Sequence, residues 1–249
     1  MRWCCGLIMV LLASPAWCLE SLELKSGPYV EYLDKKITEE KDPVKDKAMD
    51  FDHSIKVACL KNEDHPLYIL AAQYYSVVAP LAQVEKVLRE FSAYPQLFDG
   101  LVDIKVEELG TDLFSLAMEQ SVPVPFASNI KTTMKYKIEK DRNKVIFRYH
   151  LVKSNNLNFY DGFILLKAVD DQHTEIKEFD FWDADWGIAK MVGTESLYNQ
   201  SLQAIYQTDL AIKWRSEKSD ESYREIKTKS IAAAKEQSFK KCFRERVTP

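Results

Sequence analysis

Between residues 100 and 182 the chain alternates apolar and polar residues with a period of two, which is typical of strands with one buried face. In residues 129–140, for example, Ile130, Met134 and Tyr136 alternate with lysines. About six such runs follow one another, joined by short turn-forming segments. The pattern predicts a meander of antiparallel strands with one solvent-exposed face and one apolar face.

Helical patterns precede and follow this meander. After a strand-like apolar run at residues 67–78, Pro80 occupies an expected first helical position, and Val84, Leu88 and Phe91 follow at helical spacing. A longer apolar helix is predicted from about Thr194 to Trp214. We therefore expect a core domain at residues 67–215 in the order strand, short helices, sheet and long C-terminal helix.

Two polar extensions flank this domain. Residues 19–66 are acidic and poor in apolar runs, so we expect a mostly extended or disordered leader, with one strand near its end at residues 53–60. Residues 216–249 read as a charged helical tail with a modest positive balance. Such a tail suits a protein partner or peripheral contact with an anionic membrane surface.

The overall composition is that of a globular protein, with 46% hydrophobic and 29% charged residues. The formal net charge is -4, and no basic patch interleaved with aromatic residues stands out. Affinity for nucleic acid depends on the number of phosphates neutralised by lysine and arginine. The sequence therefore argues against a nucleic-acid partner.

The first 18 residues have the pattern of a secretory signal peptide. One basic residue precedes an apolar run from Trp3 to Ala13, and Ala16 and Cys18 stand at the positions that precede a cleavage site. The run is too short to span a bilayer comfortably. We expect export to a periplasmic or extracellular space; lipidation of Cys18 and an uncleaved anchor remain alternatives.

Cleavage after residue 18 would leave two cysteines, Cys59 and Cys242, in the mature chain. In an oxidising compartment such a pair is a candidate disulfide, and two separate thiols are the alternative.

The segment at residues 79–110 resembles the opening of a known fold. A helix there leads into an aromatic-proline step, Tyr94-Pro95, and then into a strand. This resembles the START-like (SRPBCC, helix-grip) superfamily, in particular its polyketide cyclase and coenzyme Q-binding type. The resemblance implies an α+β fold, in which a curved antiparallel sheet of about six to seven strands wraps around a long C-terminal helix.

The same resemblance implies a cavity between the sheet and that helix for an apolar, lipid-like, quinone-like or aromatic molecule. A single amphipathic helix cannot cover the apolar face of six strands, so large side chains or a ligand must fill the remaining space. The candidate ligand-binding residues are Phe114, Leu116, Met118, Met134, Tyr136, Phe147, Tyr149, Trp182 and Trp186.

The stretch at residues 180–186 raises the question of a metal site, because it holds Asp180, Asp183 and Asp185. Bulky aromatics separate these carboxylates, and the glycine turn and distal glutamate of a calcium loop are missing. We expect no metal. Instead the carboxylates should reach water while Trp182 and Trp186 either close the cavity mouth or pack in the core.

Motifs of catalysis are scarce. None of the four histidines sits in a nucleophile or zinc-binding pattern, and nothing indicates a cofactor. The candidate polar residues for orienting a ligand, or for acting as a general base if burial raised their pKa, are Glu119, Gln120, Asp161 and Glu178. The main hypothesis is a non-enzymatic carrier; the alternatives are an aromatase/cyclase-like enzyme and an interaction protein that acts through its tail.

Overall fold

The computed structural model describes residues 56–61, 68–121, 128–184, 194–218 and 220–236, and the structural findings concern these residues. The predicted signal peptide, most of the leader, Trp186 and Cys242 lie outside them. The proposed cleavage, the Cys59–Cys242 pairing and any role of Trp186 therefore stay predictions.

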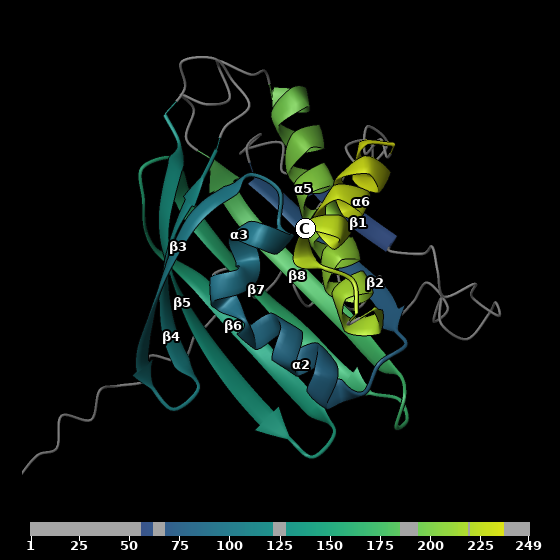
Figure 1. The fold of residues 1–249 in the computed structure, drawn as a ribbon. Coiled ribbons are helices and arrows are strands. Elements are labelled where there is room, and N and C mark those ends of the chain that lie inside the picture. The colour runs from purple at the N-terminus through teal and green to yellow at the C-terminus, as the bar shows by residue number, and fades with distance from the viewer. Residues whose placement is uncertain (1–55, 62–67, 122–127, 185–193, 219, 237–249) are drawn as a thin grey trace, which may run out of the picture.

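The described strands form one antiparallel sheet, ordered β1-β2-β8-β7-β6-β5-β4-β3 (Figure 1). The meander from β3 to β8 follows the chain, whereas β2 pairs with β8 and so brings the two ends of the domain together. β1 adds an outer strand where one was expected near the end of the leader. The bounds are β1 Lys56–Lys61, β2 Tyr68–Val77, β3 Leu101–Gly110, β4 Leu113–Gln120, β5 Ile130–Asp141, β6 Lys144–Ser154, β7 Leu157–Ala168 and β8 Thr174–Ala184.

The sheet is curved, and irregular pairing contributes to its curvature. The register shifts between Thr133 and Met134 where β5 pairs with β6, and between Leu157 and Phe159 where β7 pairs with β8. Extra residues in one strand of a pair bend that strand and increase its twist. The result is a concave face on which helices pack.

The concave face is covered by α2 Leu81–Arg89, the 3₁₀ turn η1 Phe91–Ala93, α3 Tyr94–Leu97 and α5 Thr194–Glu217 (Figure 1). From α2 and η1, Val84, Leu88 and Phe91 enter the main core, as the helical spacing predicted. Strand residues such as Leu116 and Phe147 meet them from the sheet. The predicted α+β helix-grip architecture is confirmed.

α5 is buried on more than one side. Leu202, Tyr206 and Leu210 pack with Trp182 of β8, whereas Ala211 packs in a separate cluster with Ile226 of the last helix, α6 Tyr223–Lys235. α6 begins with a capping box in which Ser222 and Glu225 bond each other's backbone N–H. The part of the tail that is described is thus a helix docked on the domain.

Gln207 of α5 fixes this arrangement. Its Nε2 donates to Leu97 O (3.1 Å) and to Ser230 Oγ (2.7 Å), and its Oε1 accepts from Asp99 N (3.0 Å). One buried amide thereby joins α3, α5 and α6. No helix in the described part of the chain is both long and apolar enough to cross a membrane.

Candidate functional site

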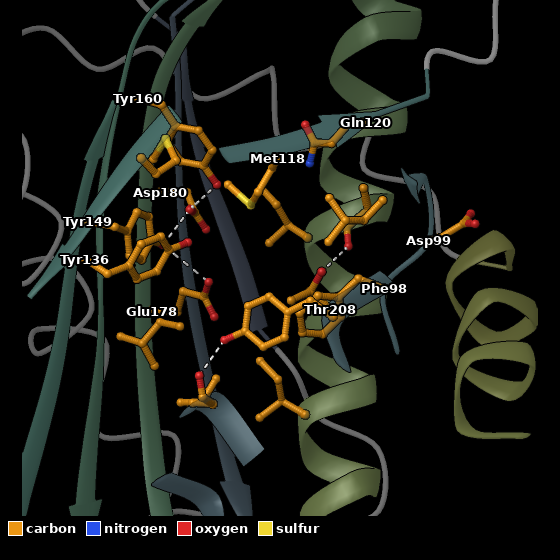
Figure 2. A pocket seen from close by; sticks show the side chains of 18 residues that line it. Phe98, Asp99, Met118, Gln120, Tyr136, Tyr149, Tyr160, Glu178, Asp180 and Thr208 are labelled. Carbon is orange, nitrogen blue, oxygen red and sulfur yellow. Dashed lines mark hydrogen bonds between the residues drawn. The ribbon is translucent and has the colours of Figure 1, made fainter. Parts of the chain in front are cut away.

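A cavity of about 170 Å³ lies between the concave face of the sheet and α5 (Figure 2). Its wall combines apolar and aromatic side chains with a few polar ones. The lining residues are Leu88, Tyr94, Phe98, Asp99, Leu101, Met118, Gln120, Met134, Tyr136, Tyr149, Tyr160, Ile164, Glu178, Asp180, Ala204, Ile205, Thr208 and Ile212.

The polarity of this wall changes from the mouth to the floor. Ala204 and Asp99 are exposed and mark the mouth. On the opposite, sheet side, Figure 2 shows the carboxyl groups of Glu178 and Asp180 and the tyrosine hydroxyls converging. A molecule bound in the cavity would therefore meet carboxyl and phenol groups on the sheet side.

Asp180 is the best satisfied carboxyl group of the floor. Its Oδ1 accepts hydrogen bonds from Tyr149 Oη (2.7 Å) and Tyr160 Oη (2.6 Å), and its Oδ2 accepts from Gln73 Nε2 at 3.4 Å. The side chain is only 1% exposed. Burial raises the pKa of the Asp180 carboxyl, while the bonds from Tyr160, Tyr149 and Gln73 act in the opposite direction.

Glu178 and Asp209 form a second, poorly satisfied pair. Glu178 is 6% exposed and Asp209 of α5 is fully buried. Within the described residues, no hydrogen bond of good geometry from a donor group reaches Glu178 Oε2 or either Oδ atom of Asp209. The two carboxyls nevertheless lie within hydrogen-bond reach of each other, a contact that requires a proton on one of them, because ionised carboxylates only accept.

The pKa values of this pair follow from its surroundings. Burial raises the pKa of the Glu178 carboxyl well above its usual range, and the charges of Asp209 and Asp180 raise it further. Burial likewise raises the pKa of Asp209 well above the ordinary value, although contacts with Glu178 and Tyr75 oppose this. The pair is thus stabilised in its protonated form in a low-dielectric environment.

The strand pairing places these groups side by side. Tyr149 of β6 lies opposite Gly162 of β7, and Gly162 lies opposite Asp180 of β8. A Cβ atom at position 162 would stand 2.3 Å from Tyr149 Cε2, so only glycine leaves room for the ring. The absence of a side chain on β7 lets Tyr149 reach across that strand to Asp180.

Four of the nine residues expected to bind ligand line the cavity: Met118, Met134, Tyr136 and Tyr149. The structure places Phe114, Leu116, Phe147 and Trp182 elsewhere, in the packed core. The first three join the cluster that contains α2 and η1, and Phe114 lies 5.2 Å from Phe91 between ring centroids. Trp182 packs against α5. They are on the concave face as expected, but helices cover that part of it.

Of the four polar residues proposed to orient a ligand, two line the cavity and two do not. Gln120 and Glu178 line the cavity, whereas Glu119 bonds Asn129 Nδ2 (2.7 Å) and lies 3.7 Å from Lys131 Nζ. Asp161 is buried but does not belong to the cavity wall.

The expectation that the aspartates of β8 reach water was wrong for Asp180, because its side chain points to the concave face of the sheet and is buried in the cavity floor. Asp183 is half-buried and accepts from Asn158 Nδ2 at 2.8 Å. Asp185 lies outside the described residues.

Sequence reasoning missed Asp209, Tyr160 and Tyr94. The available signal was Asp209 itself, the one charged residue between Glu195 and Lys213 on a predicted apolar helix. A buried charge needs a partner, so such a residue points to a polar contact across the core. Across the described ranges, no cluster of three or more His, Cys, Asp or Glu side chains is arranged to hold a metal ion.

Comparison with known proteins yields structural likeness only. No protein-family model matches the chain, and no curated protein matches it by sequence. A STAR-related lipid transfer protein from Xanthomonas axonopodis is similar in structure with a TM-score of 0.55 and 18% identity, over 65% of this chain and 93% of that one.

Two further structures share less of the geometry. The Zhui aromatase/cyclase from Streptomyces sp. R1128 gives a TM-score of 0.47 at 12% identity, over 62% of this chain and 99% of that one. A START superfamily protein from Mycobacterium smegmatis gives 0.42 at 10% identity, over 59% and 96%. The likeness to the lipid transfer protein, together with the strand order and the long helix α5 on the concave face, shows that this chain has the helix-grip fold.

Proposed function

We propose that this protein is an exported binding or carrier protein for an apolar small molecule, which it holds in the cavity between the sheet and α5. The observation that carries the proposal is the cavity itself, whose apolar lining includes Leu88, Met118, Met134 and Ile164. A cavity with apolar walls and a few convergent polar groups is the usual form of a small-molecule site.

The cavity volume limits what it holds. An apolar cavity of about 150 Å³ accommodates a molecule the size of benzene. The 170 Å³ found here therefore suits one ring or the end of a lipid-like chain. A longer ligand would extend past Ala204 and Thr208 at the mouth, where α5 borders the opening.

Native mass spectrometry of the mature protein, purified from the exported fraction, tests binding directly. We expect a stoichiometric adduct that organic extraction releases as an apolar compound. A protein that is empty and also fails to bind a panel of lipids, quinones and small aromatics would overturn the proposal.

A pair of variants locates the bound molecule. Ala204→Trp places an indole at the cavity mouth, and we expect it to abolish the adduct. Ala232→Trp makes the same change at an exposed position of α6 that does not line the cavity, and it should keep the adduct. Equal loss or equal retention in both variants would argue against this cavity as the site.

Export is supported by the signal-peptide pattern of residues 1–18. Expression of the full chain in a secreting host, followed by fractionation and intact mass measurement, tests it. We expect a mature N-terminus at Leu19 in the exported fraction. A full-length product that stays with the cells would overturn this part of the proposal and leave ligand binding unaffected.

An aromatase/cyclase-like enzyme is the second candidate, and Glu178 is the observation that favours it. A buried carboxyl with a raised pKa at a cavity wall has the properties of a general base or acid. The two functions differ in outcome: the extracted compound returns unchanged from a carrier, whereas an enzyme converts it and loses turnover in Glu178→Gln.

A further inference from the structure

The cavity floor holds more hydrogen-bond acceptors than the surrounding donors satisfy. Tyr149, Tyr160 and Gln73 all donate to Asp180. The Tyr149 hydroxyl also lies 3.5 Å from Glu178 Oε1, but its single proton serves the 2.7 Å bond to Asp180. Glu178 Oε2, on a side chain that lines the cavity and is 6% exposed, receives no donor from the described part of the chain.

The floor also lacks positive charge. The described lining includes Asp99, Glu178 and Asp180 but no lysine, arginine or histidine. The buried lysine of α5, Lys213, is 3% exposed and is already bound, with Nζ 2.9 Å from Ser76 O and 2.5 Å from Glu217 Oε1. Buried carboxylates are costly unless a cation or hydrogen-bond donors compensate them.

We propose that the ligand is an amine, with an apolar or aromatic body in the middle of the cavity and a protonated nitrogen that donates hydrogen bonds to Glu178. This inference rests on the proposed ligand-binding function and specifies the chemical class of the ligand. An ammonium group supplies both missing elements at once, because it carries up to three N–H donors and a positive charge.

Tyrosine rings complete the environment of the nitrogen. Tyr136, Tyr149 and Tyr160 line the cavity, and the rings of Tyr136 and Tyr149 stack with centroids 5.1 Å apart. The face of an aromatic ring attracts a cation by its quadrupole. Burial and the nearby charges of Asp180 and Glu178 raise the pKa of the Tyr136 hydroxyl, so this group stays neutral and adds no competing negative charge.

Binding of an amine should also release protons from the cavity floor. The titratable groups around Glu178 are Asp209 of α5, Asp180 of β8 and the tyrosines of β2, β5, β6, β7 and α3. Lys213 of α5 forms an ion pair with Glu217 instead. The contact between Glu178 and Asp209 requires one shared proton, and burial favours keeping it by raising the pKa of both carboxyls, so a cation that pairs with ionised Glu178 displaces that proton. We expect release of roughly one proton per amine bound near neutral pH.

Three probes that share a phenylethyl body and differ in the attached polar group test the class of ligand: 2-phenylethylamine, 2-phenylethanol and 3-phenylpropanoate, each titrated calorimetrically into the full mature protein. We expect the amine to bind about tenfold more tightly than the alcohol, and the carboxylate to bind weakest. Titration of the amine in two buffers of different ionisation enthalpy measures the protons released and needs no variant.

A matched pair of variants assigns the interaction to one residue. Glu178→Gln should weaken binding of the amine about tenfold and leave binding of the alcohol within about twofold. Glu119→Gln makes the same change at an acid that pairs with Lys131 and Asn129 outside the cavity, and it should change neither affinity. Should Glu178→Gln fail to fold, Asp209→Asn and the proton count on the unmodified protein serve the same purpose.

The outcomes separate this inference from the proposed function. If the alcohol binds at least as tightly as the amine, Ala204→Trp blocks it, and no protons are released, the amine inference is overturned while ligand binding stands. If none of the three probes binds, the amine inference is overturned, and the adduct measurement still decides the proposed function. If binding survives Ala204→Trp, the cavity is not the site and both proposals fall.

Discussion

The hydroxyl of Tyr149 on β6 donates a 2.7 Å hydrogen bond to Asp180 on β8, across the whole width of the intervening strand β7. The bond is possible because β7 carries Gly162 at the crossing point, so the tyrosine ring lies where a side chain would otherwise stand. One glycine thus determines how the acidic floor of the cavity is built.

Gly162→Ala should therefore break this arrangement. The added methyl group would meet Tyr149 Cε2 at 2.3 Å and Phe179 O at 2.5 Å, so the ring must move. We expect a loss of about 2 to 3 kcal/mol in the free energy of unfolding, measured with urea, because overpacking of a filled core has this cost. Gly110→Ala, where no atom lies within 4 Å of the new Cβ, should change stability by less than about 0.5 kcal/mol.

The stability of the unliganded protein should fall as the pH rises above about 4, the pKa of an acid in the unfolded chain. The folded-state pKa values of Glu178 and Asp209 are raised, so the stabilisation is complete below the pKa near 4 of an unfolded acid and is lost as the pH rises through the folded values. Each unit of difference contributes about 1.4 kcal/mol. Urea unfolding at several pH values measures the slope.

The double variant Glu178→Gln, Asp209→Asn is the control for this pH dependence. It removes both titrations while keeping the shapes of the side chains, so its stability should change much less over the same pH range. A slope as steep as that of the unmodified protein would mean that other groups control it.

Lys213→Met should destabilise the protein strongly. The change leaves the Glu217 carboxylate, whose side chain is 11% exposed, without its cation. Removing one partner of a buried ion pair costs about 3 kcal/mol or more. Lys229→Met breaks a comparable contact with Glu221 at the surface, where the lysine is 54% exposed, and should cost under about 1 kcal/mol. Chemical unfolding of both variants decides whether burial makes this difference.

Gln207→Leu should loosen α6 specifically. It removes the buried amide that bonds Leu97 O, Ser230 Oγ and Asp99 N. Unsatisfied buried groups cost about 1 to 3 kcal/mol, so we expect faster amide hydrogen exchange between Ile226 and Ala234. Exchange in β7 and β8 should not change.

Gln200→Leu, near the start of α5, is the control for α6 docking. Gln200 bonds only Ser196 among the described residues, in an exposed contact. Unchanged exchange of α6 in Gln207→Leu would show that apolar packing of Ile226 and Ala234 is sufficient to dock the helix.

The sequence by itself determined which residues form strands and which face of each strand is apolar. Side chains alternate strictly along a strand, so the pattern Ile130, Thr132, Met134, Tyr136 and Ile138 had to lie on one face. It did not determine exposure: Val102 and Val106 of β3 follow the same alternation but are 55% and 42% exposed, because β3 is the edge strand of the sheet and little covers that end of its concave face.

Only the tertiary structure decided which part of the concave face is cavity and which is core. α2 and η1 cover Phe114, Leu116 and Phe147, whereas Met134, Tyr136 and Tyr149 remain accessible between the sheet and α5. The meeting of Glu178 and Asp209 was equally invisible in the sequence. A strand pattern specifies the face of each side chain, but the contact between a strand and a distant helix depends on sheet curvature and helix position, which follow from the packing of the whole domain.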